Sequence, residues 1–208
     1  MVTLISNIYK NKIKTLLIEI EKARIMKTDF INKNDLELDL EVLENELFEI
    51  KKLGFIKTDR NDYDLTPKGR ELIKIGAIGG VFDFIHLGHI KTLYVAKSRC
   101  DLLVVIIARN KTVLKIKKRP PINDENIRKE IVSSLKLVDA TILGDEGTYV
   151  KPLFHIEPDE IYLGYDQKLL RQIEELDGLR NRYHVYQLNA HVKGIKTSSI
   201  IDRIKKIS

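Results

Sequence analysis

Apolar side chains in the first third of the chain recur at three- and four-residue intervals. This spacing covers residues 8–26 and again residues 40–53, where Leu40, Leu43 and Leu47 share one side. Such a period places apolar residues along one face of an α-helix. The pattern therefore predicts two amphipathic helices, the second of which ends at Gly54.

The pattern changes to a two-residue alternation after Gly54. Residues 55–58 and 63–66 alternate apolar and polar positions around the polar turn 59–62, which predicts two short strands. Thr66 and Pro67 then supply an N-cap and a first helical residue, so a further helix is expected. The run LGFIKTDRNDYDLTPKGREL resembles the end of a winged-helix domain. We therefore expect residues 1–75 to form a winged-helix-like domain.

From about residue 74 onward, continuous apolar runs alternate with segments of helical spacing. The run DLLVVIIA is typical of a parallel strand that is buried on both faces. The predicted strands are 73–80, 101–108, 138–143, 159–165 and 183–188, and the predicted helices are 88–99, 124–136, 147–157, 168–178 and 197–207. This alternation favours an α/β fold, a doubly wound five-stranded parallel sheet over residues 76–208. Ligands bind such sheets beyond the carboxyl ends of the strands.

Positive charge is concentrated in the second part of the chain. The 208 residues carry a formal net charge of +6. Residues 1–75 hold 14 basic and 14 acidic side chains, whereas residues 76–208 hold 22 and 16. A basic excess is typical of proteins that bind nucleic acids or small polyanions. The polyanion site is therefore expected in the second part, where residues 115–119 read KIKKR.

The helix that would enter DNA in a winged-helix domain is acidic. Residues 35–50 carry seven carboxylates and no lysine or arginine. Because phosphate contacts need cations, this composition argues against DNA binding. It favours a structural role or a dimer contact for the first domain.

Other features of the composition suggest a cytoplasmic protein. No run of 18 apolar residues is present, so no membrane association is expected. The N-terminus lacks the features of a secretion signal. The single cysteine, Cys100, has no partner for an internal disulfide and is expected to be a small core residue.

Residues 79–89 read GGVFDFIHLGH and connect a predicted strand to a predicted helix. A strand, two glycines, a short loop and a helix form the layout of a phosphate site at a helix N-terminus. The run matches neither G-x-G-x-x-G nor G-x-x-x-x-G-K-S/T, which excludes a dinucleotide-cofactor motif and a P-loop. His86 and His89 can donate hydrogen bonds to phosphates, whereas a zinc site would need a third ligand from a distant segment.

The same run resembles the G-x-F-D-x-x-H-x-G-H signature of the nucleotidyltransferases that include glycerol-3-phosphate and choline-phosphate cytidylyltransferases. The resemblance implies a Rossmann-like fold and transfer of a nucleotidyl group from an NTP to a phosphorylated acceptor, with release of pyrophosphate. It implies that His86 and His89 are catalytic. The nucleotide-binding positions that it implies in this run are Gly80, Val81, Phe82, Asp83 and Gly88. Asp83 is also placed to cap the turn or to help hold a magnesium ion.

The resemblance continues in the lysine-rich segment. Residues 115–132 are similar to the segment in which these enzymes carry phosphate-binding lysines and a helix arginine. This implies that Lys117 or Lys118, together with Arg128, contacts the triphosphate or the acceptor phosphate. We expect Lys117 and Arg128 to be catalytic and the lysine-rich residues to form a loop after the second strand.

Two further segments match the family near the end of the chain. YLGYDQ (162–167) stands where the cytidylyltransferases hold the ribose or base, which implies Gly164 and Asp166 as nucleotide-binding residues. GIKTSSII (194–201) resembles the signature R-T-x-G-I-S-T-T-x-I. Thr197 and Ser198 would offer hydroxyls and free amides to the β- and γ-phosphates.

Within this family, the LGYDQ turn and the run ARNKTVLKIKKRPPI are most similar to the archaeal-type FAD synthetases. That resemblance implies transfer of AMP from ATP to FMN, which gives FAD, with Mg²⁺ accompanying the nucleotide. It also implies a homodimer, because enzymes of this family are often dimers.

Two other functions stay open here. One is a cytidylyltransferase that uses CTP and glycerol 3-phosphate or another phosphoalcohol. The other is a winged-helix DNA-binding regulator with a degenerate transferase fold as a ligand sensor.

Overall fold

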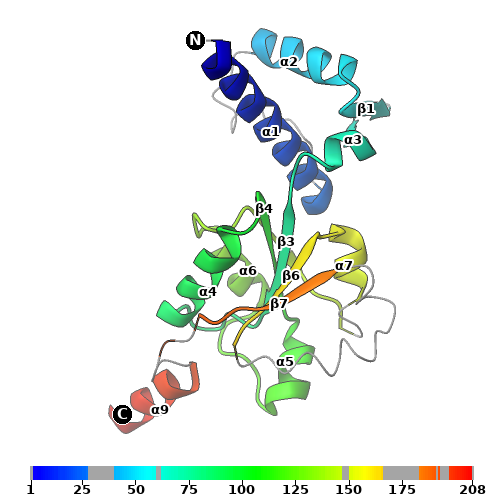
Figure 1. Cartoon of the computed structure of the whole chain (residues 1–208). Coiled ribbons are helices and arrows are strands. Elements are labelled where there is room, and N and C mark those ends of the chain that lie inside the picture. Colours follow the sequence, from blue (N-terminus) through cyan, green and yellow to red (C-terminus); the bar gives the residue numbers. More distant parts are fainter. Residues whose placement is uncertain are drawn as a thin grey trace. The chain divides into compact units, whose positions relative to one another are not determined.

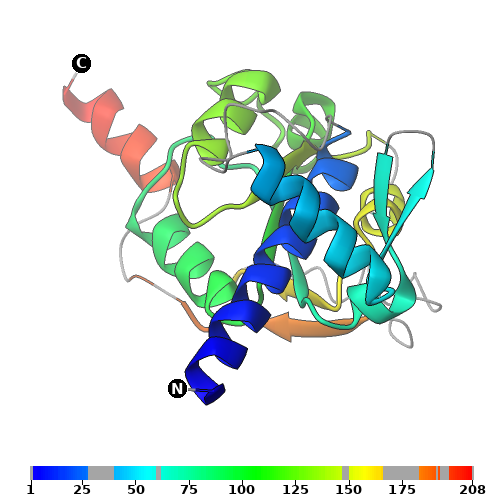
Figure 2. The same ribbon diagram turned by 90° about the horizontal axis from the view of Figure 1, so that it is seen from above.

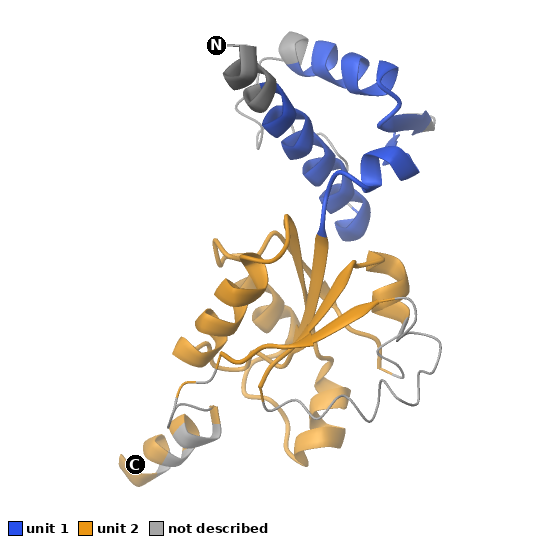
Figure 3. Ribbon diagram, in the orientation of Figure 1, with its two compact units in different colours: residues 1–74 blue, residues 75–208 orange. Residues whose placement is uncertain are grey.

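The computed structural model of the chain describes residues 2–27, 40–59, 62–146, 150–165, 183–190, 192 and 197–207. The chain divides into two compact units, Met1–Lys74 and Ile75–Ser208 (Figure 3). The boundary between the units therefore falls directly before the first apolar strand of the alternating region.

Unit 1 contains the two predicted helices and the predicted hairpin (Figure 1). Its described elements are α1 (Val2–Met26), α2 (Leu40–Lys52), β1 (Ile56–Asp59), β2 (Asp62–Leu65) and α3 (Pro67–Arg70). The strands are antiparallel, with Ile56 opposite Leu65. The Thr66 hydroxyl accepts a hydrogen bond from the Gly69 amide, as the predicted N-cap requires. The helix that it caps is only one turn long, and the winged-helix assignment stays a prediction.

Buried apolar side chains in unit 1 come from both long helices and from β1. They include Ile13, Leu16, Leu17, Ile20, Leu43, Leu47, Ile50 and Ile56. Their spacing along α1 and α2 is the three- and four-residue interval seen in the sequence, so each helix buries one side. Unit 1 therefore has apolar packing of its own.

Unit 2 is a parallel sheet with helices on both sides, and the described residues contribute five strands in the order β5-β4-β3-β6-β7 (Figures 1 and 2). The predicted doubly wound α/β fold is confirmed. The strands are β3 (Ile75–Gly80), β4 (Leu102–Ile107), β5 (Ala140–Leu143), β6 (Glu160–Leu163) and β7 (His184–Gln187). The described helices are α4 (Leu87–Lys97), α5 (Asn110–Lys117), α6 (Glu125–Ser133), α7 (Val150–Ile156) and α9 (Thr197–Ile207).

The strand order creates a switch point beside β3. The chain runs from β3 to β4 and β5 on one side, and then returns to β6 and β7 on the other. Ile78 of β3 therefore lies opposite Val105 of β4 and Tyr162 of β6. The connections leave the carboxyl ends of β3 and β6 in opposite directions. Doubly wound sheets bind ligands at such a switch point.

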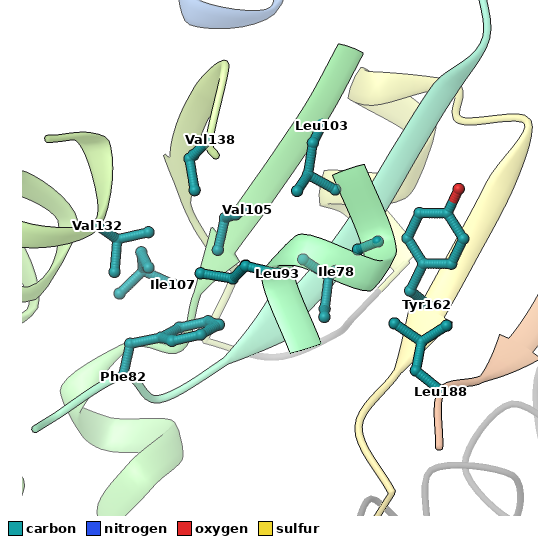
Figure 4. Packing of buried hydrophobic residues seen from close by; sticks show 11 residues of the cluster. Ile78, Phe82, Leu93, Leu103, Val105, Ile107, Val132, Val138, Tyr162 and Leu188 are labelled. Carbon is teal, nitrogen blue, oxygen red and sulfur yellow. The ribbon is translucent and has the colours of Figure 1, made fainter. Parts of the chain in front are cut away.

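The core of unit 2 fills the space between the sheet and two of its helices (Figure 4). Leu93 of α4 and Val132 of α6 are fully buried against sheet residues that include Val105 and Ile107. Figure 1 shows α7 on the opposite side of the sheet from α4, and its Ile156 is also fully buried. Helices on both faces explain why the central strand β4 is apolar along its whole length.

The helix α5 was not predicted from the sequence. The lysine-rich residues that begin at position 115 were expected in a loop, but the chain is helical to Lys117. Carboxylates fourteen and fifteen residues away stabilise its first turn. Glu125 accepts from the Asn110 amide at 2.6 Å, and Asp124 accepts from the Asn110 side chain at 2.7 Å. The predicted helix 168–178 lies outside the described residues.

Candidate functional site

The loop between β3 and α4 is anchored in the core by Phe82. Phe82 adopts the left-handed backbone conformation, with φ 52°, and only 5% of its surface is exposed. A Cβ atom at Gly80 would lie 2.5 Å from the Phe82 ring, so only glycine leaves room for this turn. The loop that carries the predicted site residues therefore has a fixed anchor.

The two histidines of this loop lie against each other at the start of α4. Their ring centroids are 3.9 Å apart, with an angle of 19° between the ring planes. The His89 ring also packs on Phe82, at 5.1 Å. His86 occupies the N-cap position of α4, but its side chain does not cap the helix. The amide groups of the first turn are thus not engaged by that side chain and face the carboxyl edge of the sheet.

The surroundings of His89 favour the neutral imidazole. Burial lowers its pKa from 6.5 to about 4, and the charges of His86 and Lys117 act in the same direction. An interaction with the Phe84 backbone acts in the opposite direction. The buried Nδ1 atom of His89 makes no hydrogen bond of normal geometry among the described residues. An anion at this position would accept a hydrogen bond from the ring, and its charge would raise the pKa of His89 back toward the ordinary value.

Asp83 binds backbone amides. Its carboxylate is buried and accepts from the amides of Ile122 and Asn123 at 2.9–3.1 Å. The Asn123 side chain donates in return to the Asp83 carbonyl at 2.8 Å. Both carboxylate oxygens are therefore engaged by the segment that precedes α6. Of the two roles considered for this carboxylate, the loop-tying one agrees with these contacts.

Arg128 does not have the position expected of a phosphate ligand. Its surface is completely buried. Its guanidinium donates to the carbonyls of Val81 at 2.6 Å, Ala108 at 2.8 Å and Asn123 at 3.0 Å, and to Oδ1 of Asn110 at 2.8 Å. These contacts favour a structural role, and the direct phosphate contact of Arg128 stays a prediction. Sequence spacing identified the residue, but it did not reveal that the guanidinium turns inward.

The lysines lie at the end of α5. Lys117 is the last helical residue and is exposed, and its charge contributes to the lowered pKa of His89. Lys118 follows in the left-handed conformation, with φ 56°, and its amide donates to the Leu114 carbonyl at 2.9 Å. The structure thus brings Lys117 into electrostatic range of the histidine pair.

For the remaining predicted residues, the structure gives a position in the chain or a single contact, and two of them lie wholly or partly outside the described residues. Gly164 directly follows β6, the strand that pairs with β3. The Gly88 carbonyl accepts from the Thr92 hydroxyl at 2.9 Å. Thr197 is the first residue of α9, which lies apart from the sheet in both views (Figures 1 and 2). Asp166 and the side chain of Ser198 lie outside the described residues.

Sequence reasoning did not select Arg109 and Asn110, which follow β4 at the same edge of the sheet. The Arg109 guanidinium lies 3.0 Å from Glu125 and 3.9 Å from Glu146. Asn110 accepts from Arg128 and is bound by the carboxylates that start α6. Their position directly after a buried apolar strand was the signal that could have identified them.

Neither a metal cluster nor a reactive thiol is found in the described part of the chain. No group of three or more potential metal-ligating side chains occurs there. Burial raises the pKa of the Cys100 thiol to about 11. Its Sγ lies 2.8 Å from where a Cβ on Gly76 would be, so Cys100 fills the core. Within the same residues, no helix combines the length and apolar character needed to cross a membrane.

Comparison with known proteins gives a family match that falls within unit 2. A family model described as Cytidylyltransferase-like matches residues 77–203. The chain is 49% identical over 89 residues to the FAD synthase of Thermoplasma volcanium, which covers 43% of this chain and 62% of the relative. It is 42% identical over 127 residues to the FAD synthase of Thermoplasma acidophilum, which covers 59% of this chain and 87% of the relative. The first of these matches spans less than two thirds of the relative's own length.

A solved structure is also similar. The crystal structure of the lipopolysaccharide core biosynthesis protein from Thermoplasma volcanium has a TM-score of 0.53 and 37% sequence identity to this chain. The match covers 58% of this chain and 99% of that one.

Proposed function

The chain belongs to the cytidylyltransferase-like family, and on that basis we propose that it transfers a nucleotidyl group from an NTP to a phosphorylated acceptor. More specifically, we propose that it moves AMP from ATP to FMN and so forms FAD and pyrophosphate. The names of the two FAD synthase relatives support this choice of substrates.

The stacked pair of His86 and His89 is the observation that carries the proposal. Both rings lie at the start of α4, beside the switch point of the sheet. Uncapped amides of a helix N-terminus bind anions, and imidazole N–H groups add donors of fixed position. A triphosphate held at this point would meet both kinds of donor, and Lys117 would add a positive charge.

The reaction itself exchanges one phosphoanhydride bond for another. A phosphate oxygen of FMN attacks the α-phosphorus of ATP, and the bond from that phosphorus to the oxygen bridging the β-phosphate breaks. That bridging oxygen leaves with pyrophosphate. Because both reactants are anions, catalysis consists mainly of positioning and of neutralising charge. His86 and His89 would donate to the α-phosphate oxygens, where negative charge increases in the transition state.

A divalent cation, Mg²⁺ in our proposal, would enter with the phosphates of the nucleotide. Mg²⁺ is commonly bound through substrate phosphates and few protein carboxylates. The described residues fit a protein-held cation poorly, because both oxygens of Asp83 are engaged by amides. No step of the proposed reaction therefore depends on a metal ligand from these residues. The homodimer stays a prediction.

Product formation tests the proposed substrates. The full chain is incubated with Mg²⁺, ATP and FMN, and FAD and pyrophosphate are measured. Equal amounts of the two products are expected. Parallel reactions contain CTP in place of ATP, or glycerol 3-phosphate in place of FMN. Turnover only with CTP and glycerol 3-phosphate would exclude the proposed substrates.

A pair of histidine variants tests the proposed site. His89→Ala should lower kcat by about a hundredfold to a thousandfold, the usual cost of removing one transition-state donor. His184→Ala is the matched control, because His184 is exposed and lies at the amino end of β7. Thermal melting shows whether both variants remain folded. Near-normal turnover by folded His89→Ala would mean that the reaction takes place elsewhere.

A further inference from the structure

Two side chains of opposite charge are buried in and beside the histidine loop. Arg128 is fully buried and Asp83 is 3% exposed. Burying an unpaired charge is costly unless hydrogen bonds compensate for the lost water. Each of these groups is therefore expected to have its partners arranged around it, and the structure provides them.

The Arg128 guanidinium joins three segments that are distant in the sequence. Val81 belongs to the loop after β3, Ala108 and Asn110 belong to the segment after β4, and Asn123 precedes α6. All four accepting oxygens lie within 2.6–3.0 Å of a guanidinium nitrogen. The planar, rigid guanidinium fixes the directions of these bonds as well as their lengths.

Asp83 adds a second connection between two of the same segments. Its carboxylate accepts from the amides of Ile122 and Asn123, and its carbonyl accepts from the Asn123 side chain. Residues 81–83 lead directly to the histidines, and residues 119–123 lead directly from Lys117 and Lys118. The Arg119 guanidinium also lies 3.9 Å from Asp83.

We propose that Asp83 and Arg128 are positioning residues that hold the histidine pair and the end of α5 in one fixed relative arrangement. The proposal rests on the proposed roles of His86, His89 and Lys117. The hydrogen bonds described for Asp83 and Arg128 all go to other protein groups, so these two residues would act through the histidines and the lysine. The Asp83 and Arg128 side chains bind backbone groups, and in one case an asparagine side chain, in the loops that carry the groups expected to contact phosphate.

Loss of this arrangement should affect turnover more than nucleotide binding. A displacement of about 1 Å between reacting groups costs about a hundredfold in rate. We therefore expect Arg128→Met, Arg128→Lys and Asp83→Asn to lower kcat by about a hundredfold. The KM for ATP should change by much less, because single lysine and amide contacts can still form. A direct phosphate contact by Arg128 would instead raise the KM for ATP.

The titration of His89 reports the arrangement independently of activity. The charge of Lys117 is one of the influences that lower the pKa of His89, after burial and His86. NMR spectra of the histidine ring are recorded across pH for the wild type, for Lys117→Met and for the three variants. We expect the pKa of His89 to rise in each variant, as it does in Lys117→Met. Combining Arg128→Met with Lys117→Met should raise it no further than the larger single effect.

The control is a variant that loses comparable hydrogen bonds at the opposite edge of the sheet. The Lys97 ammonium donates to the Asp101 carbonyl and to Asp139, both at 2.6 Å, before β4 and β5 begin. Lys97→Met should lower the melting temperature and leave both the pKa of His89 and kcat unchanged. Asp83→Asn and Arg128→Lys keep the size or charge of the original side chains, so they decide the question if Arg128→Met does not fold.

Two results would overturn the proposal. One is an unchanged pKa of His89 in folded Asp83→Asn and Arg128→Lys. The other is an equal rise of that pKa in Lys97→Met, which would indicate general loosening. Absence of turnover by the wild type with ATP and FMN would reject the proposed function instead, while the titrations would still test the positioning role.

Discussion

At the residue scale, His89 shows how surroundings set the chemistry of a side chain. Its pKa is lowered from 6.5 to about 4 by burial, by His86 and by Lys117. The unfolded chain therefore binds this proton below about pH 6.5, whereas the folded chain binds it only below about pH 4. His89 therefore does not reduce the free energy of unfolding above about pH 6.5. As the pH falls from 6.5 to about 4, protonation of the unfolded chain lowers the free energy of unfolding.

Urea denaturation at pH 7 and pH 5 measures this effect. The wild type should lose about 1–2 kcal/mol more than His89→Gln between the two values, because glutamine does not titrate. Comparing the two proteins cancels the contributions of groups that both contain. An equal loss in the two proteins would show that His89 keeps its ordinary pKa in the folded state.

The sequence was sufficient to select the histidines of the candidate site, but it did not show what Arg128 contacts. His86 and His89 are recognisable because glycines, aspartate and histidines occur at fixed spacing between a strand and a helix. Arg128 occurs at a helical position with solvent-compatible neighbours, so its complete burial is not visible in the sequence. The direction of its guanidinium depends on carbonyls from three segments, and only the folded chain brings these together.

At the scale of elements, α5 shows where local pattern fails. Residues 110–117 read NKTVLKIK, which contains β-branched residues and only one buried side chain, Val113. Neither helix propensity nor apolar spacing is strong in eight such residues. The first turn depends on Asp124 and Glu125, which are supplied by the start of the next helix. Long-range capping of this kind overrides the local signal.

The end of α5 provides a prediction about backbone strain. Lys118 has φ 56°, a conformation that costs about 1 kcal/mol for a residue with a Cβ and little for glycine. Lys118→Gly and Lys118→Ala both remove the side-chain charge, and only alanine keeps the Cβ. We expect Lys118→Gly to be more stable than Lys118→Ala by about 1 kcal/mol, measured by urea denaturation at pH 7. Equal stability would mean that residue 118 leaves the left-handed region in solution.

At the scale of the whole molecule, the sequence predicted the class of the sheet better than its order. Continuous apolar runs alternating with helices indicated parallel strands buried on both faces, and the five described strands of unit 2 are parallel. The order β5-β4-β3-β6-β7 depends on which way each connection turns. No single run records that choice, since it arises from packing of the helices on the two faces. The switch point beside β3 therefore became visible only in the folded chain.

The division into two units leads to a prediction about residues 75–208 alone. Every described residue of the candidate site lies in this range, and so does the buried cluster of unit 2. The Ile75 amide donates to Oδ2 of Asp159 at 2.7 Å, and the Ile75 carbonyl accepts from the Asp159 amide at 2.8 Å. Cutting the chain before Ile75 therefore leaves these bonds within the remaining part.

We expect residues 75–208 to unfold cooperatively and to form FAD from ATP and FMN at a rate within about tenfold of the full chain, a difference of about 1.4 kcal/mol in activation free energy. Thermal melting by circular dichroism and the pyrophosphate assay measure the two properties. His89→Ala in the shortened chain should lower kcat by about a hundredfold to a thousandfold, as we expect in the full chain, which ties any activity to the same site. A cooperative melt combined with a loss of more than a hundredfold would show that residues 1–74 contribute to catalysis. Loss of the cooperative transition would show instead that unit 2 depends on unit 1 for its stability.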